Sequence, residues 1–540
     1  MTAAALVASP ASPVADAAMR GDLAAVRELL REGADVNAAQ GDGMTALHWA
    51  AYNDEPELAA VLLVAGANVD ARTRLGDYTP LHLAASHAAA EVVAALLEAG
   101  ADPSAPTSTG GAHPLHLAAA GGSAAAVAAL IDRGADLDAR EGVRGQTPLM
   151  FAAAYDRVEA IEMLVSRGAD VAATTRVIDI PARELADRAD QRGEAPPTPA
   201  QEQLYAPNEE EPLSYADLVG AHGGLTALLH AAREGHADSV AALLAAGADI
   251  DQPSAGDGTP PMLMAMLNGH FDLALSLMER GADPRLASDA GTTPLYVALN
   301  LHWAPKSRYP QQHAYRQQQA TYLDVMRALL EAGVDPNARL NRHLWYMSFN
   351  FDLLDVDTMG ATPFWRAAYA LDVEAMRLLV AHGADPSIAT TKPPQRFRRT
   401  RDSELDPSGL PPVPVGGPAV YPIHAASGVG YGQGFAANAH RHVPDGWLPA
   451  VRYLVEELGA DVNARDLNGY TPVHHAAARG DNELIRYLVE HGADVTAVSR
   501  SGQTTADMAN GPVQRIQPFP ETVALLEQLG AKNNDNCVSC

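Results

Sequence analysis

The chain has 540 residues, of which 47% are hydrophobic and 5% aromatic, and 38 Lys and Arg against 66 Asp and Glu give a formal net charge of −28. So acidic a composition repels phosphate backbones and disfavours general nucleic-acid binding. The longest charge-free stretch, residues 103–131, is interrupted by proline and glycine. A membrane span needs about 20 continuous apolar residues, so none is predicted.

The chain begins with MTAAALVASPASPVADAA, a short apolar run followed by small residues. It lacks the basic region that opens a secretory signal peptide, and its apolar core covers only residues 3–8. We expect residues 1–13 to be disordered and the chain, as written, to be cytoplasmic. A periplasmic or secreted location is the alternative, if this segment is the end of a longer signal peptide.

An internal repeat follows, in which a T-P-L-H-x-A-A sequence precedes a G-A-D-x-N sequence. Its first five glycines are 33 or 34 residues apart, a period typical of stacked helical repeats. The glycine recurs at Gly33, Gly66, Gly100, Gly134, Gly168, Gly247, Gly281, Gly333, Gly383, Gly459, Gly492 and Gly530.

One copy, residues 76–104, shows how the repeat is expected to fold. Thr79 is a good helix N-cap, and Pro80 suits the first helical position because its missing N–H is not needed there. Gly100 can adopt the left-handed conformation that ends a second helix. The apolar faces of the two helices are Leu81, Ala84 and Ala85, then Val92, Val93, Leu96 and Leu97. Helices this short must stack on neighbouring copies to bury those faces.

These motifs resemble the ankyrin repeat, in a long array of bacterial type with insertions. The resemblance covers most of residues 14–531 in about twelve units. It implies an all-α solenoid built from helix–turn–helix units joined by hairpins. We expect such units over 14–173, beginning with an N-terminal cap, and over 223–531, ending with a C-terminal cap.

Five insertions interrupt the expected array. Residues 174–222 contain GEAPPTP and NEEEP, an acidic and proline-rich composition that we expect to stay loose. The other insertions occupy 301–320, 339–356, 390–420 and 428–448. By resemblance, 174–222, 339–356 and 390–420 lie at the hairpin edge of the solenoid, and the other two lie where paired helices join.

The insertion at 339–356 is unusually aromatic for this chain. A core strand is not expected, because the array has no sheet. The aromatic side chains either form a satellite core, in which insertions cover one another, or an exposed patch that binds a partner, since aromatic residues dominate interface hot spots. A small-molecule pocket is the third alternative. The candidate partner-binding residues are Trp345, Tyr346, Phe349, Phe351, Trp303 and Trp365.

Two groups of histidines have different expected roles. The first belongs to the repeat signature, where the imidazole should hydrogen-bond locally and connect neighbouring hairpins: His48, His82, His116 and His474. The second borders the 428–448 insertion and has the types and spacing of weak metal ligands: His424, His440 and His442. No Asp, Glu or Cys accompanies them at a characteristic spacing, so we predict no metal site.

The tail, residues 532–540, is expected to be flexible and ends in a C-x-x-C formed by Cys537 and Cys540. Haem attachment would need a following histidine, and a zinc site would need a second ligand pair. The two cysteines are therefore a weak redox candidate only. A disulfide, a reactive dithiol, a tether to a partner and two incidental thiols remain alternatives, and we predict no cofactor.

No catalytic motif is present: G-x-S-x-G, H-E-x-x-H, the P-loop and the kinase set are all missing. We therefore predict no enzyme. The resemblance implies a protein–protein interaction scaffold that binds through hairpin tips, the concave face of the first helices and the aromatic insertion. The acidic composition adds the expectation of a cationic or mixed protein partner. The alternatives are a small-ligand, metal or redox accessory protein, using the His-bordered insertion or the cysteine pair, and a rigid spacer.

Overall fold

The computed structural model describes residues 12–195, 198, 211–303, 310–344, 356–394, 406–430, 441–511 and 517–536. The chain divides into two compact units. The first consists of Met1–Val177 and Gly223–Gly256, and the second of Ile178–His222 and Asp257–Cys540.

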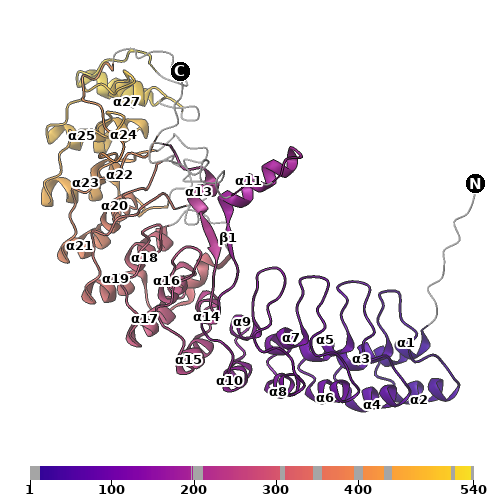
Figure 1. Ribbon diagram of the computed structural model, residues 1–540. Helices are drawn as coiled ribbons and strands as arrows, with labels where there is room; N and C mark the ends of the chain where they lie inside the picture. The colour runs from indigo at the N-terminus through magenta and orange to yellow at the C-terminus, as the bar shows by residue number, and fades with distance from the viewer. Residues whose placement is uncertain are drawn as a thin grey trace, which may run out of the picture. The chain divides into compact units, whose positions relative to one another are not determined.

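The first unit stacks helix pairs, with the first helix of each pair in one row and the second helix in another (Figure 1). Long loops project beyond the row of first helices. The first helices are α1 (Pro13–Met19), α3 (Ala46–Tyr52), α5 (Pro80–Ser86), α7 (Pro114–Gly121), α9 (Pro148–Ala154) and α14 (Ala227–Glu234). The second helices are α2 (Leu23–Arg31), α4 (Pro56–Val64), α6 (Ala90–Glu98), α8 (Ala124–Asp132), α10 (Val158–Ser166) and α15 (Ala237–Ala245).

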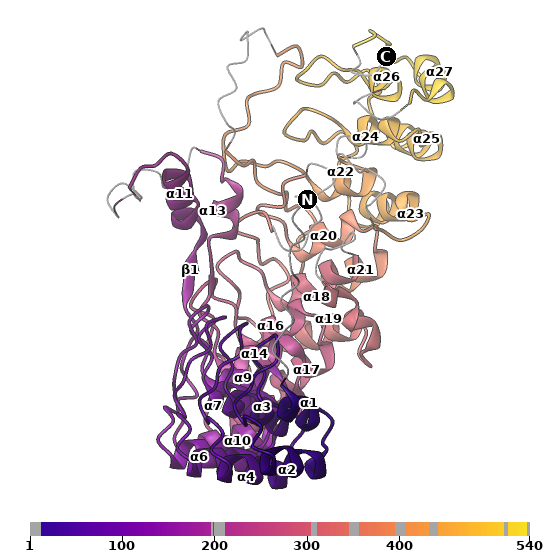
Figure 2. The same ribbon diagram turned by 90° about the vertical axis from the view of Figure 1, so that its right-hand side faces the viewer.

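The second unit repeats the two-row arrangement, which Figure 2 shows from the side. Its first helices are α16 (Pro261–Leu267), α18 (Pro294–Trp303), α20 (Pro363–Tyr369), α22 (Pro422–Ser427), α24 (Pro472–Ala478) and α26 (Thr505–Ala509). Its second helices are α17 (Phe271–Glu279), α19 (Tyr322–Glu331), α21 (Val373–Ala381), α23 (Trp447–Arg452), α25 (Asn482–Glu490) and α27 (Pro520–Gln528). A π-helix, Tyr453–Glu457, continues α23.

The copy at 76–104 confirms the predicted local structure. Thr79 is the N-cap of α5, and its hydroxyl accepts a hydrogen bond from the His82 N–H at 3.4 Å. Gly100 ends the second helix with a φ of 94°. All seven predicted core side chains of this copy are buried: Leu81, Ala84, Ala85, Val92, Val93, Leu96 and Leu97.

The insertion at 174–222 is not uniformly loose, contrary to the prediction. Its described residues contain two strands that pair with each other, and two helices between them. The strands are β1 (Val177–Asp179) and β2 (Ala221–Gly223), and the helices are α11 (Ile180–Gln191) and α13 (Tyr215–Val219). The prediction that no sheet is present is therefore wrong for this small ribbon, although the fold remains predominantly helical.

Local capping explains the helix that composition missed. The Asp179 carboxylate accepts a hydrogen bond from the Ala182 N–H at 2.9 Å, which caps the start of α11. The proline-rich sequence GEAPPTP begins only at Gly193, after α11 has ended. The average composition of residues 174–222 hides the boundary between the helix α11 and the proline-rich sequence that follows it.

Two further insertions are fixed to the unit by side-chain contacts. The Asp272 carboxylate accepts hydrogen bonds from the backbone N–H groups of Gln319 (2.8 Å) and Ala320 (2.9 Å), at the end of the 301–320 insertion. Arg500 pairs with Asp406 at 2.5 Å and donates to the Pro411 carbonyl at 2.6 Å, which holds the end of the 390–420 insertion on a neighbouring hairpin. None of the described helices is long and apolar enough to cross a lipid bilayer.

Candidate functional site

Exposed apolar side chains lie on two loops of the first unit and at the first residue of β1. Leu75, Val143 and Val177 are 83%, 61% and 42% exposed. We call these three residues, together with Arg72, Arg74, Arg144 and Arg176 on the same loops, the hairpin edge.

The arginines of the hairpin edge are exposed cations on a strongly acidic chain. Within the described part of the chain, none of the four forms an ion pair with a carboxylate. Glu141 on the same edge is turned inward. Burial alone would raise its pKa, but hydrogen bonds from the backbone N–H groups of Gln146, Val143 and Arg144 hold that pKa below its ordinary value. The other acidic residues beside these positions are Asp42, Asp77 and Asp179, the last of which caps α11.

A row of large side chains runs along the first helices beside this edge. Each lies four residues after the helix N-cap, so stacking places them at the same level of successive helices. All four are half-buried: Trp49, Leu83, Leu117 and Phe151. The Trp49 Nε1–H donates to the Gln40 side-chain oxygen at 2.9 Å, so the row adjoins the base of a hairpin. We call Trp49, Leu83, Leu117 and Phe151 the inner-helix row. Together with the hairpin edge, this row gives the first unit a surface that is partly apolar and partly cationic.

Three of the predicted signature histidines, His48, His82 and His116, connect their repeat to the next one, as predicted. Among the described residues, the His474 Nε2 forms no hydrogen bond, so the prediction is not confirmed for that histidine. The His82 Nδ1 accepts a hydrogen bond from the Thr79 N–H at 3.1 Å, so its proton is on Nε2, which donates to the Ala105 carbonyl at 2.9 Å. His48, His116 and His424 make the same pair of contacts, with the carbonyls of Tyr78, Gln146 and Ala464. Both contacts require a neutral ring, and burial lowers the pKa of His82, His116 and His424 to about 4.

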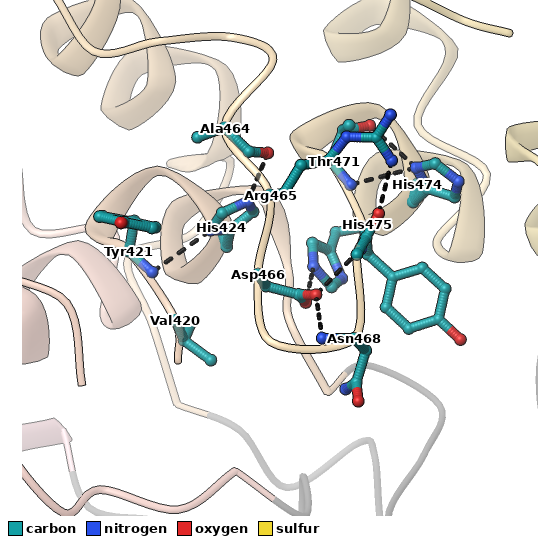
Figure 3. Close-up of polar contacts among 12 residues, drawn as sticks. Val420, Tyr421, His424, Ala464, Arg465, Asp466, Asn468, Thr471, His474 and His475 are labelled. Atoms are coloured by element: carbon teal, nitrogen blue, oxygen red, sulfur yellow. Dashed lines mark hydrogen bonds and ion pairs between the residues drawn. The ribbon is translucent and has the colours of Figure 1, made fainter. Parts of the chain in front are cut away.

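A buried aspartate–histidine pair lies in the second unit, next to His424 (Figure 3). Asp466 and His475 have almost no exposed surface, and the His475 Nε2 is 3.1 Å from the Asp466 Oδ2. The Asp466 Oδ1 accepts hydrogen bonds from the backbone N–H groups of Asn468 and Tyr470, both at 2.9 Å. Burial alone would raise the pKa of Asp466, but His475 and these donors outweigh it and lower the pKa.

Sequence reasoning missed this pair, although a signal was present. In other repeats the position of Asp466 caps the hairpin with a hydroxyl: the Ser499 Oγ accepts from the Gln503 N–H at 3.0 Å, and the Thr107 Oγ1 from the Ala112 N–H at 3.0 Å. An aspartate caps the turn with one oxygen and keeps a second oxygen free for His475. The combination of Asp at this position with His nine residues later is the signal.

The predicted partner-binding tryptophans lie in packed surroundings. Trp303 is half-buried, and its Nε1–H donates to the Asp372 carboxylate at 2.9 Å. Trp365 has no exposed surface, and its Nε1–H donates to the Val420 carbonyl at 2.9 Å. Trp365 is therefore a core residue, and its prediction as a partner contact is wrong, because α20 turns this position toward its neighbouring repeat. The other four candidates, Trp345, Tyr346, Phe349 and Phe351, lie outside the described residues.

The weak metal and redox candidates are placed as follows. His424 uses both ring nitrogens in its repeat contacts, so it is a structural histidine. The His442 Nδ1 lies 2.9 Å from the Val443 carbonyl oxygen. His440, Cys537 and Cys540 lie outside the described residues. Among the residues that the structure covers, no three His, Cys, Asp or Glu side chains are grouped to hold a metal ion.

Stacked helix pairs of about 33 residues, connected by buried histidines, define a helical-repeat solenoid. Models of ankyrin repeats in three copies match residues 14–107, 104–175, 204–288 and 228–390, and a model of many copies matches 453–509. The chain belongs to the ankyrin repeat family.

Several characterised proteins share short stretches with this chain. Protein phosphatase 1 regulatory subunit 27 of Mus musculus is 40% identical over 72 residues, which are 13% of this chain and 46% of that protein. Ankyrin repeat domain-containing protein 49 of Bos taurus is 46% identical over 52 residues, 10% of this chain and 22% of that protein. The chain thus spans less than half of these relatives. The crystal structure of the human ASB11 ankyrin repeat domain aligns at 24% identity and a TM-score of 0.38, over 51% of this chain and all of that domain.

Proposed function

We propose that this chain is a non-catalytic protein-binding scaffold, and that the hairpin edge and the inner-helix row of the first unit bind an acidic polypeptide segment with apolar side chains. The observation that carries the proposal is the combination of exposed Leu75, Val143 and Val177 with four arginines that lack a described carboxylate partner. The regulatory-subunit and ankyrin-domain relatives support the general class.

The local charge decides the kind of partner. The net charge of −28 suggested a cationic partner, but a partner experiences the charges nearest to it, because salt screens charges beyond about 10 Å. At the hairpin edge the four exposed arginines outnumber the accessible carboxylates of Asp42, Asp77 and Asp179, so the local charge is slightly positive. The apolar tips favour a polypeptide over a nucleic acid, which offers few aliphatic contacts. A cationic partner remains the proposal for acidic faces elsewhere on the chain.

Reversing the charge of the hairpin edge should release the partner. We expect the triple variant Arg74→Glu, Arg144→Glu and Arg176→Glu to weaken capture from native extract by at least about tenfold, because three attractive charges become repulsive. The matched control reverses three arginines outside the hairpin edge: Arg20→Glu, Arg31→Glu and Arg167→Glu. Equal loss in both variants would assign the effect to net charge and contradict the proposal. Loss of the captured species on nuclease treatment would identify a nucleic acid instead.

The aromatic insertion is a second proposed contact. Replacing Trp345, Tyr346, Phe349 and Phe351 with Ala should weaken binding of a captured partner by about tenfold or more, because buried aromatic side chains dominate interface energies. Far-UV circular dichroism should show unchanged helical content. A variant that loses helicity would show instead that these side chains form a satellite core.

A further inference from the structure

A cavity of about 450 Å³ lies in the second unit between two repeat junction loops and the start of α22. Its walls include Pro386 and Ser387 from one loop, Gly459 and Asp461 from the next, and Tyr421 and Ile423 at the beginning of the helix. This volume suits a small ligand or a single side chain of a peptide.

At comparable junctions an asparagine side chain spans the two loops. The Asn337 Nδ2 donates to the Gly383 carbonyl at 2.9 Å, and its Oδ1 accepts from the Asp385 N–H at 2.7 Å. Asn463 makes the same two contacts with Gly492 and Asp494, at 2.9 and 2.7 Å. Asn37 repeats the pattern in the first unit. Each primary carboxamide thus satisfies one backbone acceptor and one backbone donor of the following loop.

The cavity lies where that carboxamide is missing. Ser387 occupies the position of Asn337 and Asn463, but its hydroxyl donates to the Asp385 carboxylate of its own loop at 2.6 Å. Within the described residues, no group donates to the Gly459 carbonyl, and no group accepts from the Asp461 N–H. These two atoms are the equivalents of the pair that Asn337 satisfies.

The helical segment before this junction contains one extra residue. The sequence LVEELGAD, residues 454–461, has one residue more before its glycine than LVEHGAD at 488–494. The additional residue is accommodated by the π-helix Tyr453–Glu457, and π-helical turns are rare and often mark functional sites. The second helices of this junction are joined by polar contacts: Arg377 pairs with Glu457, and its guanidinium lies 4.4 Å from the centre of the Tyr453 ring.

We propose that this cavity binds a primary carboxamide, either as the side chain of Asn or Gln in a peptide or as a free aromatic amide. The amide oxygen would accept from the Asp461 N–H, and the amide nitrogen would donate to the Gly459 carbonyl. Tyr421 and Ile423 provide apolar contact for the rest of the ligand. A carboxylate fits poorly, because it has no proton for Gly459 and is repelled by the Asp461 side chain. The site lies in the second unit and does not depend on the hairpin edge.

Binding of benzamide to the full chain tests the proposal. We expect saturable binding with a shift of the Asp461 amide signal in NMR spectra, and binding of benzoate at least about tenfold weaker, because a site built for an N–H rejects an analogue without it. An Asn-containing tripeptide and its Asp-containing counterpart distinguish a peptide source from a free amide. Absence of any benzamide-dependent shift at Asp461, or equal binding of benzoate, would overturn the proposal.

A variant that supplies the missing carboxamide provides the internal control. Ser387→Asn should occupy the site and reduce benzamide affinity by about tenfold or more. Ser104→Asn makes the same change at the same repeat position in the first unit and should leave benzamide binding unchanged. Undiminished benzamide binding by a folded Ser387→Asn protein would show that the ligand binds elsewhere. Should that variant fail to fold, the Asp461 signal of the unmodified chain still decides the question.

Discussion

Lowering the pH from 7 to 5 should reduce the free energy of unfolding by roughly 2 kcal/mol for each signature histidine whose pKa lies near 4. His82 and His116 in the first unit and His424 in the second have pKa values of about 4, and His474 of about 3, because burial disfavours the charged ring. The ordinary value is 6.5. The folded histidine thus stays neutral while the unfolded one takes up a proton below pH 6.5, so the stability present above that pH is lost as the pH falls toward 4.

The hydrogen-bond geometry explains why the folded repeat cannot avoid this loss of stability by taking up the proton itself. The Nδ1 of each ring faces a backbone N–H, 3.1 Å away for His82 and His116. A proton at Nδ1 would oppose that donor and remove the contact that caps the helix. Protonation must therefore accompany opening of the repeat.

Urea unfolding followed by circular dichroism at a series of pH values measures this effect. The double variant His82→Asn and His116→Asn removes two titrating groups and keeps a side-chain acceptor near each helix start. We expect it to be less stable at pH 7 and to lose less stability than the unmodified chain between pH 7 and 5. An unchanged pH dependence in this variant would refute the assignment to the signature histidines.

Removing the carboxylate of the buried Asp466–His475 pair should destabilise the repeat that contains α24 by about 3 kcal/mol. The variant Asp466→Ser keeps a hydroxyl for the turn, as Ser499 does in the next repeat, but leaves His475 buried without its charged partner. Hydrogen exchange of the α24 amides reports this loss locally, because repeat arrays open in segments.

The next repeat also suggests the compensating change. Met508 occupies the position of His475, so Asp466→Ser with His475→Met copies a hydroxyl and an apolar side chain already found together. We expect the double variant to regain most of the lost protection, because apolar replacement of a buried ion pair is often neutral or stabilising. If Asp466→Ser alone leaves exchange unchanged, or the double variant exchanges as fast as the single one, the pair is not what stabilises this repeat.

The repeat architecture follows from local chemistry that is visible in the sequence. Thr79, Pro80 and Gly100 act within a few residues of themselves, so capping and chain reversal can be predicted from their order alone. The period of 33 or 34 residues then requires stacking, and the structure confirms the helix pairs and the connecting role of His48, His82 and His116. Composition was a weaker guide, since α11 forms inside a segment that looked loose on average.

Contacts between residues far apart in the sequence were decided only by the tertiary structure. The aromatic pattern around Trp365 is equally compatible with an exposed patch and a core, and only the packing of α20 against its neighbours buries this side chain. His424 borders an insertion in the sequence, yet the Ala464 carbonyl, 40 residues away, completes its hydrogen bonds. The cavity beside Ser387 lies between two loops that are more than 70 residues apart in the chain. Burial and spacing between repeats arise from the stacking of whole units, and no single unit encodes them.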